Sequence, residues 1–321
     1  MQKVMERANR LGVIGFLLLV VAGCVPSVRQ YQQDRGFVFG TVYSITYQSA
    51  DNLQAEIEAE LRKVDAEFSM FNEQSTVSRL NRGEQVDTTA AFSEIYQLAQ
   101  RVNRETYGAF DITVAPLVNA WGFGFKHEQI PTDQQVDSLL QIRNQMDFSA
   151  IAKGHGCDVV ARLLESHGIT NYMVEIGGEV VLRGQSPSQA DWRIGVSKPT
   201  ADTLAVEGEI QAVLTLTDRA IATSGNYRNF YDKDGRRYAH TIDPRTGYPV
   251  QHSLLSATVL AADCATADAY ATSFMVLGLD SAKMVLERHP ELSAYLIYSD
   301  GPEHQMQVWH SPALNGAITT P

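Results

Sequence analysis

The chain has 321 residues, of which 44% are hydrophobic and 20% are charged, and its formal net charge at pH 7 is −11. This composition is typical of a globular protein and excludes a disordered chain, which lacks the apolar residues that a core needs. The acidic balance argues against nucleic acid as a partner, because proteins that bind nucleic acid usually present a basic face. An anionic substrate would then need local compensation, such as a bound divalent cation.

The N-terminal segment predicts a lipoprotein signal. Basic residues within 3–10 precede an apolar run at 11–21, and small residues lead to Cys24. The run is shorter than the roughly 20 apolar residues of a membrane-spanning helix. We expect residues 1–23 to be a signal peptide, Cys24 to carry lipid, palmitate included, and residues 24–36 to be a tether. This predicts an anchor in the inner membrane that faces the periplasm, and Val25 leaves sorting to the outer membrane open.

Residue periodicity predicts the elements in chain order. A strand is expected at residues 37–47, followed by helices at 53–68, from about 92 to 108, and at 153–167, with a polar loop at 72–83. Strands are expected at 172–183, 192–196, 212–216 and 256–261, helices at 265–277 and 281–289, and strands at 294–298 and 306–310. The density of strands without intervening helices predicts an α+β fold with a mostly antiparallel sheet and packed helices. We expect one continuous domain at 37–313 and a tail at 314–321.

Two cysteines remain besides Cys24. Cys157 and Cys264 each lie in an apolar helical stretch. The sequence does not give the distance that separates a disulfide from free thiols. Their apolar surroundings favour two buried free thiols.

His240 and Asp243 come just before a turn formed by Pro244 to Gly247. Such a turn can hold a reactive side chain at the mouth of a pocket. His240 is therefore a candidate general acid or base, with Asp243 orienting the loop. A turn whose histidine only hydrogen-bonds the backbone fits the same pattern.

Asp268 and Thr272 are four residues apart on a predicted helix, so that both oxygens project from one face. Hard cations such as Mg²⁺ take oxygen ligands of this kind. A threonine that bonds the carbonyl of the preceding helical turn explains the same spacing without a metal. Lys153 lies at the start of a predicted helix, where anions such as a diphosphate bind. The glycine-bearing turns at 175–179 and 223–227 are expected to line a pocket.

Four segments together resemble the ApbE family, the FAD:protein FMN transferases. They are GAFDITVAPLVNAWGFG at 108–124, DFSAIAKG at 147–154, HTIDPRTG at 240–247 and ADAYAT at 267–272. The resemblance extends from about residue 37 to about residue 277. It implies the ApbE-like fold, which is related to the T-fold.

The resemblance also implies the site. Metal would be held by Asp268, Thr272 and the backbone carbonyl of Ala150. Contacts to FAD would come from Phe39, Phe71, Ala109, Phe110, Asp111, Asp147, Lys153 and Ile242.

The function that the resemblance implies is Mg²⁺-dependent transfer of FMN from FAD to a threonine or serine hydroxyl of an acceptor protein, with release of AMP. The acceptors would be subunits of membrane redox complexes, of the Na⁺-translocating quinone reductase or Rnf type. Two alternatives stay open: an Mg²⁺-dependent FAD pyrophosphatase that gives FMN and AMP, and a flavin-binding lipoprotein without turnover.

Overall fold

The computed structural model of the protein describes residues 30–123, 130–142, 144–199, 209–226, 230–233, 236–300 and 305–321. The expected signal peptide and Cys24 lie outside these residues. Within the described part of the chain, no helix has both the length and the apolar character that crossing a membrane requires.

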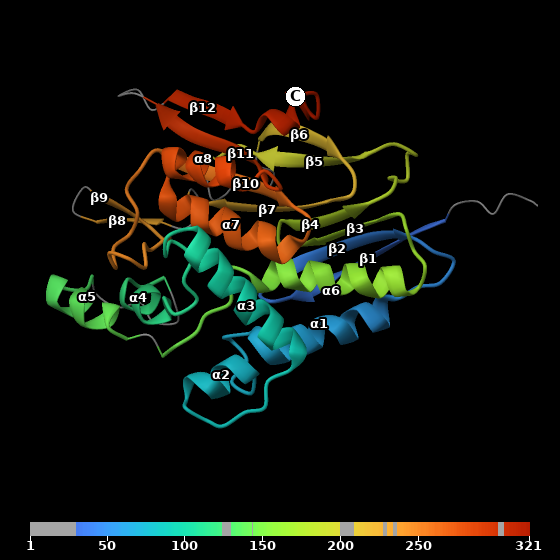
Figure 1. The fold of residues 1–321 in the computed structure, drawn as a ribbon. Helices are drawn as coiled ribbons and strands as arrows, with labels where there is room; N and C mark the ends of the chain where they lie inside the picture. The colour runs from blue at the N-terminus through green and yellow to red at the C-terminus, as the bar shows by residue number, and fades with distance from the viewer. Residues whose placement is uncertain are drawn as a thin grey trace, which may run out of the picture.

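An eight-stranded sheet forms the centre of the molecule (Figure 1), in the order β1-β2-β3-β4-β7-β10-β11-β12. Every neighbouring pair in it is antiparallel, which confirms the expected sheet type. Its strands are β1 (Tyr31–Val38), β2 (Thr41–Gln48), β3 (Tyr172–Ile176), β4 (Glu179–Arg183), β7 (Arg219–Gly225), β10 (Leu254–Ala261), β11 (Ser293–Asp300) and β12 (Gln305–His310). A smaller sheet contains β5 (Trp192–Ser197), β6 (Ile210–Leu216) and β13 (Ile318–Thr319), and β8 (Phe230–Lys233) pairs with β9 (Arg236–Ala239).

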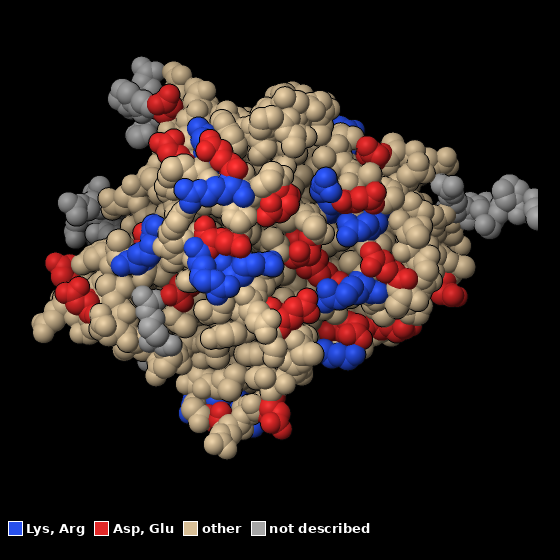
Figure 2. All heavy atoms as spheres, in the orientation of Figure 1, with Lys and Arg blue, Asp and Glu red and all other residues tan. Residues whose placement is uncertain are grey.

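Helices cover one face of the large sheet (Figure 1). The helices in the described residues are α1 (Gln54–Phe68), α2 (Thr76–Asn81), α3 (Ala90–Glu105), α4 (Ala115–Ala120), α5 (Asp133–Leu140), α6 (Ala152–Ser166), α7 (Cys264–Leu277) and α8 (Leu279–Arg288). Of these, α4 and α5 lie to one side of the sheet, near β8 and β9 (Figure 1). Helices α6 and α7 pack against each other and on the strands, while α1 packs on α6 and α3 on α7. Figure 2 shows acidic and basic side chains intermixed over this helical face.

The alternation of side chains along the central strands explains why the sheet is covered on both faces. In β4, Val181 joins the core beneath α6, whereas Val180 and Leu182 point to the opposite face. There they pack with Trp192 of β5 and Leu214 of β6. Because both faces are buried, these strands contain near-continuous apolar runs.

Two expected strands are hairpins. The segment 37–47 turns at Phe39 and Gly40, whose φ angles are 52° and 75°, and the segment 172–183 turns at Gly177 and Gly178, at 62° and 103°. Successive residues with positive φ are the requirement of a tight hairpin turn, and glycine meets it without steric cost. The single strands predicted for these two segments are therefore wrong.

Three further differences concern short elements. The expected loop at 72–83 contains α2, whose first turn is capped by the Ser75 hydroxyl, which accepts a hydrogen bond from the Ser78 amide at 3.1 Å. Helix α5 begins with a capping box between Thr132 and Gln135, but its eight residues were too few for a periodic pattern. Strand β7, expected only as a turn near its end, lies between β4 and β10.

The folded region extends past both expected boundaries. Strand β1 includes residues 31–36, which were expected to belong to the tether, and pairs with β2 along its whole length. At the other end, Leu314 is buried in the core and β13 pairs with β6, so that residues 314–321 are not a free tail. Cys157 and Cys264 are both buried and free, as favoured from the sequence.

Gly154 allows α6 and α7 to approach closely. A Cβ atom at this position would lie 2.3 Å from the carbonyl oxygen of Cys264, which is a backbone atom and has no side-chain freedom to move. Gly154→Ala should therefore push the helices apart and lower the free energy of unfolding by about 1–3 kcal/mol or more, the usual cost of overpacking. Urea denaturation measures this loss. The matched control is Gly195→Ala, where the nearest atom is the flexible Ile210 Cδ1 at 3.4 Å; equal stability of the two variants would contradict the expectation.

Candidate active site

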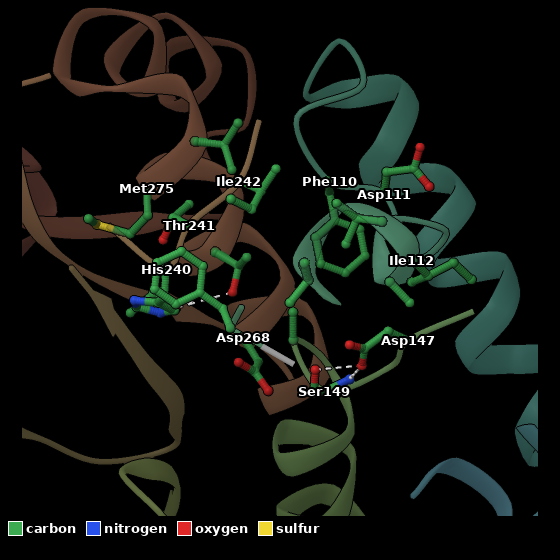
Figure 3. A pocket seen from close by; sticks show the side chains of 18 of the residues that line it. Phe110, Asp111, Ile112, Asp147, Ser149, His240, Thr241, Ile242, Asp268 and Met275 are labelled. Atoms are coloured by element: carbon green, nitrogen blue, oxygen red, sulfur yellow. Dashed lines mark hydrogen bonds between the residues drawn. The ribbon is translucent and has the colours of Figure 1, made fainter. Parts of the chain in front are cut away.

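A cavity of about 510 Å³ lies beside the start of α6 and along α7. Parts of the chain that are distant in sequence meet there. Phe110 and Asp111 lie on one side and His240 and Ile242 on the other, with Asp268 between them (Figure 3). The segment before α6, the Gly177 turn and the end of β7 complete the wall.

The cavity gathers most of the residues that the sequence motifs indicated. Eleven of those thirteen line it: Phe71, Ala109, Phe110, Asp111, Asp147, Ala150, Lys153, His240, Ile242, Asp268 and Thr272. The two glycine-bearing turns also contribute, through Gly177 and Glu179 and through Thr223 to Gly225.

Phe39, predicted as a flavin contact, and Asp243, predicted to orient the loop, are not among the residues that line the cavity. The Phe39 ring packs behind it, where its Cε2 would be 2.7 Å from a Cβ on Gly156 of α6. Asp243 is occupied by its own turn, since its carboxylate accepts hydrogen bonds from Arg245 Nε at 2.8 Å and Nη2 at 2.7 Å. Asp243 therefore shapes the loop, as expected, without facing the cavity.

The loop that carries His240 is fixed at several points. Ile242 forms an isolated antiparallel bridge with Pro249, and the Thr241 hydroxyl donates to Asn226 Oδ1 at 2.5 Å. Trp121 Nε1 donates a hydrogen bond to the Gly247 carbonyl at 2.7 Å, so this buried tryptophan anchors the loop by packing and by hydrogen bonding. His240 therefore faces the cavity from a turn that is fixed by hydrogen bonds. Its ring is edge-on to that of Phe123, with 6.4 Å between the two ring centroids.

Two predicted flavin contacts, Asp111 and Asp147, form the same local motif. Each carboxylate accepts hydrogen bonds from the backbone amide and the hydroxyl of the residue two positions later, Thr113 and Ser149 (Figure 3 for Asp147). These side-chain bonds hold the two turns at the cavity wall in place.

The floor of the cavity holds buried charges. Lys153 Nζ lies 3.0 Å from Glu179 Oε1 and 3.7 Å from Asp268 Oδ2, and both acidic side chains are almost fully buried. Burial lowers the pKa of Lys153, but the carboxylates of Asp268 and Glu179 outweigh it and raise that pKa above its usual value. Burial raises the pKa values of Glu179 and Asp268, with Lys153 acting in the opposite direction.

The N-terminus of α6 already binds an anionic side chain of the protein. The Gly154 amide donates to Asp268 Oδ2 at 3.1 Å, so the carboxylate of one helix caps the first turn of the other. The expected diphosphate position at residues 152–154 is therefore partly occupied by a side chain of the protein. Lys153 remains the positive group of that turn that faces the cavity.

Asp158 fixes the start of α7, and with it the metal candidates. It is buried on α6 and accepts hydrogen bonds from the backbone amides of Cys264 and Ala265, at 2.8 and 2.9 Å. One helical turn after Asp268, the Thr272 hydroxyl lies 3.1 Å from that of Ser224 at the end of β7.

The oxygen donors that line the cavity are of the chemical type that a hard divalent cation binds. Asp268 supplies a buried carboxylate, Thr272 a hydroxyl and Ala150 a carbonyl beside the same cavity. Glu179 Oε2 is also buried there and has no hydrogen-bond partner among the described residues, which is unusual for a carboxylate oxygen. Glu179 and Ser224 were missed as individual site residues; the adjacent glycines marked their turns but not their chemistry.

The model of the ApbE family matches residues 39–296. The chain belongs to the ApbE family.

Relatives of this ApbE-family chain are named FAD:protein FMN transferase. The one from Vibrio cholerae is 38% identical over 299 residues, which cover 84% of this chain and 88% of the relative. The one from Haemophilus influenzae is 39% identical over 297 residues, 82% and 85% of the two chains.

Solved structures show the same fold. The flavin transferase ApbE from Vibrio cholerae superposes with a TM-score of 0.79 at 35% identity, over 89% of this chain and 98% of that one. The apo flavinyl transferase ApbE of Pseudomonas stutzeri gives 0.78 at 28% identity, over 90% and 96%. The expected family, the α+β fold and the transferase class are confirmed.

Proposed function

We propose that this chain transfers FMN from FAD to a threonine or serine hydroxyl of an acceptor protein and releases AMP. The observation that carries the proposal is the juxtaposition of His240 with the half-buried Lys153 and the buried Glu179 and Asp268 in one cavity. The names of the relatives support the choice of FAD as the flavin donor.

The proposed reaction forms one bond to phosphorus and breaks another. The acceptor hydroxyl oxygen forms a bond to the phosphorus of the FMN half, and the bond between that phosphorus and the bridging diphosphate oxygen breaks. AMP leaves with the electron pair. The hydroxyl proton passes to His240, which faces the cavity from its braced turn. When bound, Mg²⁺ would neutralise charge on the diphosphate.

The residues of the chain position the substrate. Lys153 supplies a positive charge beside the diphosphate, while Phe71 and Phe110 offer ring faces at the cavity wall. Asp268, Thr272 and the carbonyl of Ala150 would hold the metal. Phosphoryl transfer depends mainly on such positioning and charge neutralisation.

One incubation separates the proposal from its alternatives. The pure protein is mixed with FAD, Mg²⁺ and a candidate acceptor subunit of a Na⁺-translocating quinone reductase or Rnf-type complex, and flavin fluorescence is read on the denatured acceptor band. A labelled acceptor supports the transferase. AMP without labelling identifies a pyrophosphatase, and bound, unchanged FAD identifies a flavin-binding lipoprotein.

We also propose that lipid on Cys24 anchors the protein to the inner membrane, facing the periplasm. Cys24→Ser should release the protein from membranes and leave its soluble activity unchanged, because the described residues that line the cavity all lie at Met70 or later in the chain. Membrane fractionation measures the release. Membrane association of the Cys24→Ser variant after correct removal of its signal peptide would contradict the lipid anchor.

A further inference from the structure

Lys153 forms ion pairs with two buried carboxylates, and the shorter one is with Glu179. Its ammonium is at hydrogen-bond distance from Glu179 Oε1, 3.0 Å, and beyond it from Asp268 Oδ2, 3.7 Å. Asp268 Oδ2 takes the Gly154 amide instead. The lysine therefore lies closer to Glu179 on β4 than to Asp268 on α7, the candidate metal ligand, although it is within ion-pair distance of both.

Glu179 is a buried residue whose carboxylate forms an ion pair with Lys153. It follows directly on the Gly177-Gly178 turn and is 2% exposed, and the part of the chain that the structure describes gives its Oε2 no hydrogen-bond partner. A buried carboxylate normally destabilises a protein unless a charge compensates it. Lys153 is the described cation within ion-pair distance of Glu179.

We infer that Glu179 is a positioning residue that holds the Lys153 ammonium off Asp268 and so keeps Asp268 available to the divalent cation. This inference rests on the proposed function, because it assumes the metal site at Asp268. Without the negative charge of Glu179, Asp268 is the remaining buried carboxylate next to the lysine. The ammonium then moves to Asp268 and competes with the cation for it.

The charge balance agrees with this role. Lys153, Glu179 and Asp268 sum to one negative charge when all three are ionised. A divalent cation changes the sum to one positive charge, which suits an anionic diphosphate. A lysine bound to Asp268 would oppose the entry of that cation.

The test is the affinity of the flavin-free protein for Mn²⁺, measured through the electron paramagnetic resonance signal of the free ion. Omitting FAD keeps any contact between Lys153 and phosphate out of the measurement. Glu179→Gln, which preserves the size of the side chain, should weaken Mn²⁺ binding by about 10- to 100-fold, as other residues that orient metal ligands do. Glu175→Gln on the same hairpin is the matched control, and should leave the affinity within about threefold, because Glu175 bonds the Gly178 amide and does not line the cavity.

The decisive comparison repeats the substitution without the lysine. Lys153→Met alone should not weaken Mn²⁺ binding, since it removes the competitor. In that background Glu179→Gln should change the affinity less than about threefold, because coupled residues are non-additive. A loss that is as large in the Lys153→Met background as in the lysine-containing protein would overturn the inference and make Glu179 a metal ligand.

Other outcomes would overturn either the inference or the metal site. Unchanged affinity of Glu179→Gln in the lysine-containing protein overturns the inference and leaves the metal site intact. Absence of Mn²⁺ binding by the unaltered protein overturns the metal site itself, and the inference with it. Circular dichroism verifies that each variant is folded; should Glu179→Gln not fold, weaker Mn²⁺ binding by Lys153→Met alone would still contradict the competition.

Discussion

Asp268→Ala should abolish FMN transfer while the protein stays folded. The substitution removes the buried carboxylate among the candidate metal ligands, and charge neutralisation by a metal is worth several kcal/mol in the transition state, which corresponds to a rate loss of about 10³-fold or more. Lys153 keeps its ion pair with Glu179 at 3.0 Å, so the substitution does not leave a buried ammonium unpaired. The measurement is the transfer rate in buffer that is first treated with EDTA and then repleted with Mg²⁺.

The control for this variant is Asp280→Ala, which removes an exposed carboxylate from the first turn of α8. It should retain normal turnover. Thermal unfolding of both variants separates a lost metal from a lost fold. Near-normal transfer by Asp268→Ala in the repleted buffer would show that the metal is held elsewhere.

His240→Asn should slow the transfer step by about 10²- to 10⁴-fold, the usual contribution of a positioned acid or base. FAD should bind almost as tightly as before, because Lys153 and the aromatic wall remain. The Asn variant should also keep the loop, since the bridge of Ile242 to Pro249 and the bond from Trp121 to Gly247 do not involve the imidazole. Single-turnover transfer and equilibrium FAD titration on one preparation measure the two effects separately.

A loss of FAD affinity in proportion to the loss of rate would make His240 a binding residue and end its assignment as the base. His167→Asn is the matched control. That histidine lies on the surface at the end of α6, where its Nε2 is 3.0 Å from Glu56, and it should affect neither quantity.

Local patterns predicted the longer elements. Helices α1, α3, α6, α7 and α8 were found within a few residues, because their apolar residues recur with the helical period on the side that the core covers. The segments 37–47 and 172–183, each predicted as one strand, are parts of hairpins. The strand-like residue pattern continues through both turns, so the reversal of chain direction is seen only in the positive φ angles of the turn residues.

The sequence by itself determined the family, the fold class and most of the candidate site, because motifs such as DFSAIAKG and ADAYAT are contiguous and keep their residue identities. It did not determine which of those residues meet. The bond between Gly154 and Asp268 joins positions 114 residues apart, and it exists because α6 and α7 pack against each other over the sheet.

The tertiary structure alone decided the roles of three residues. It placed Phe39 behind the cavity and turned Asp243 toward Arg245, and it brought Glu179 onto Lys153. The periodicity of apolar residues and the spacing between two residues indicate only how side chains are arranged along one helix or strand. The partner of a buried charge is set by the order of strands and the packing of helices, which bring together residues that no local pattern connects.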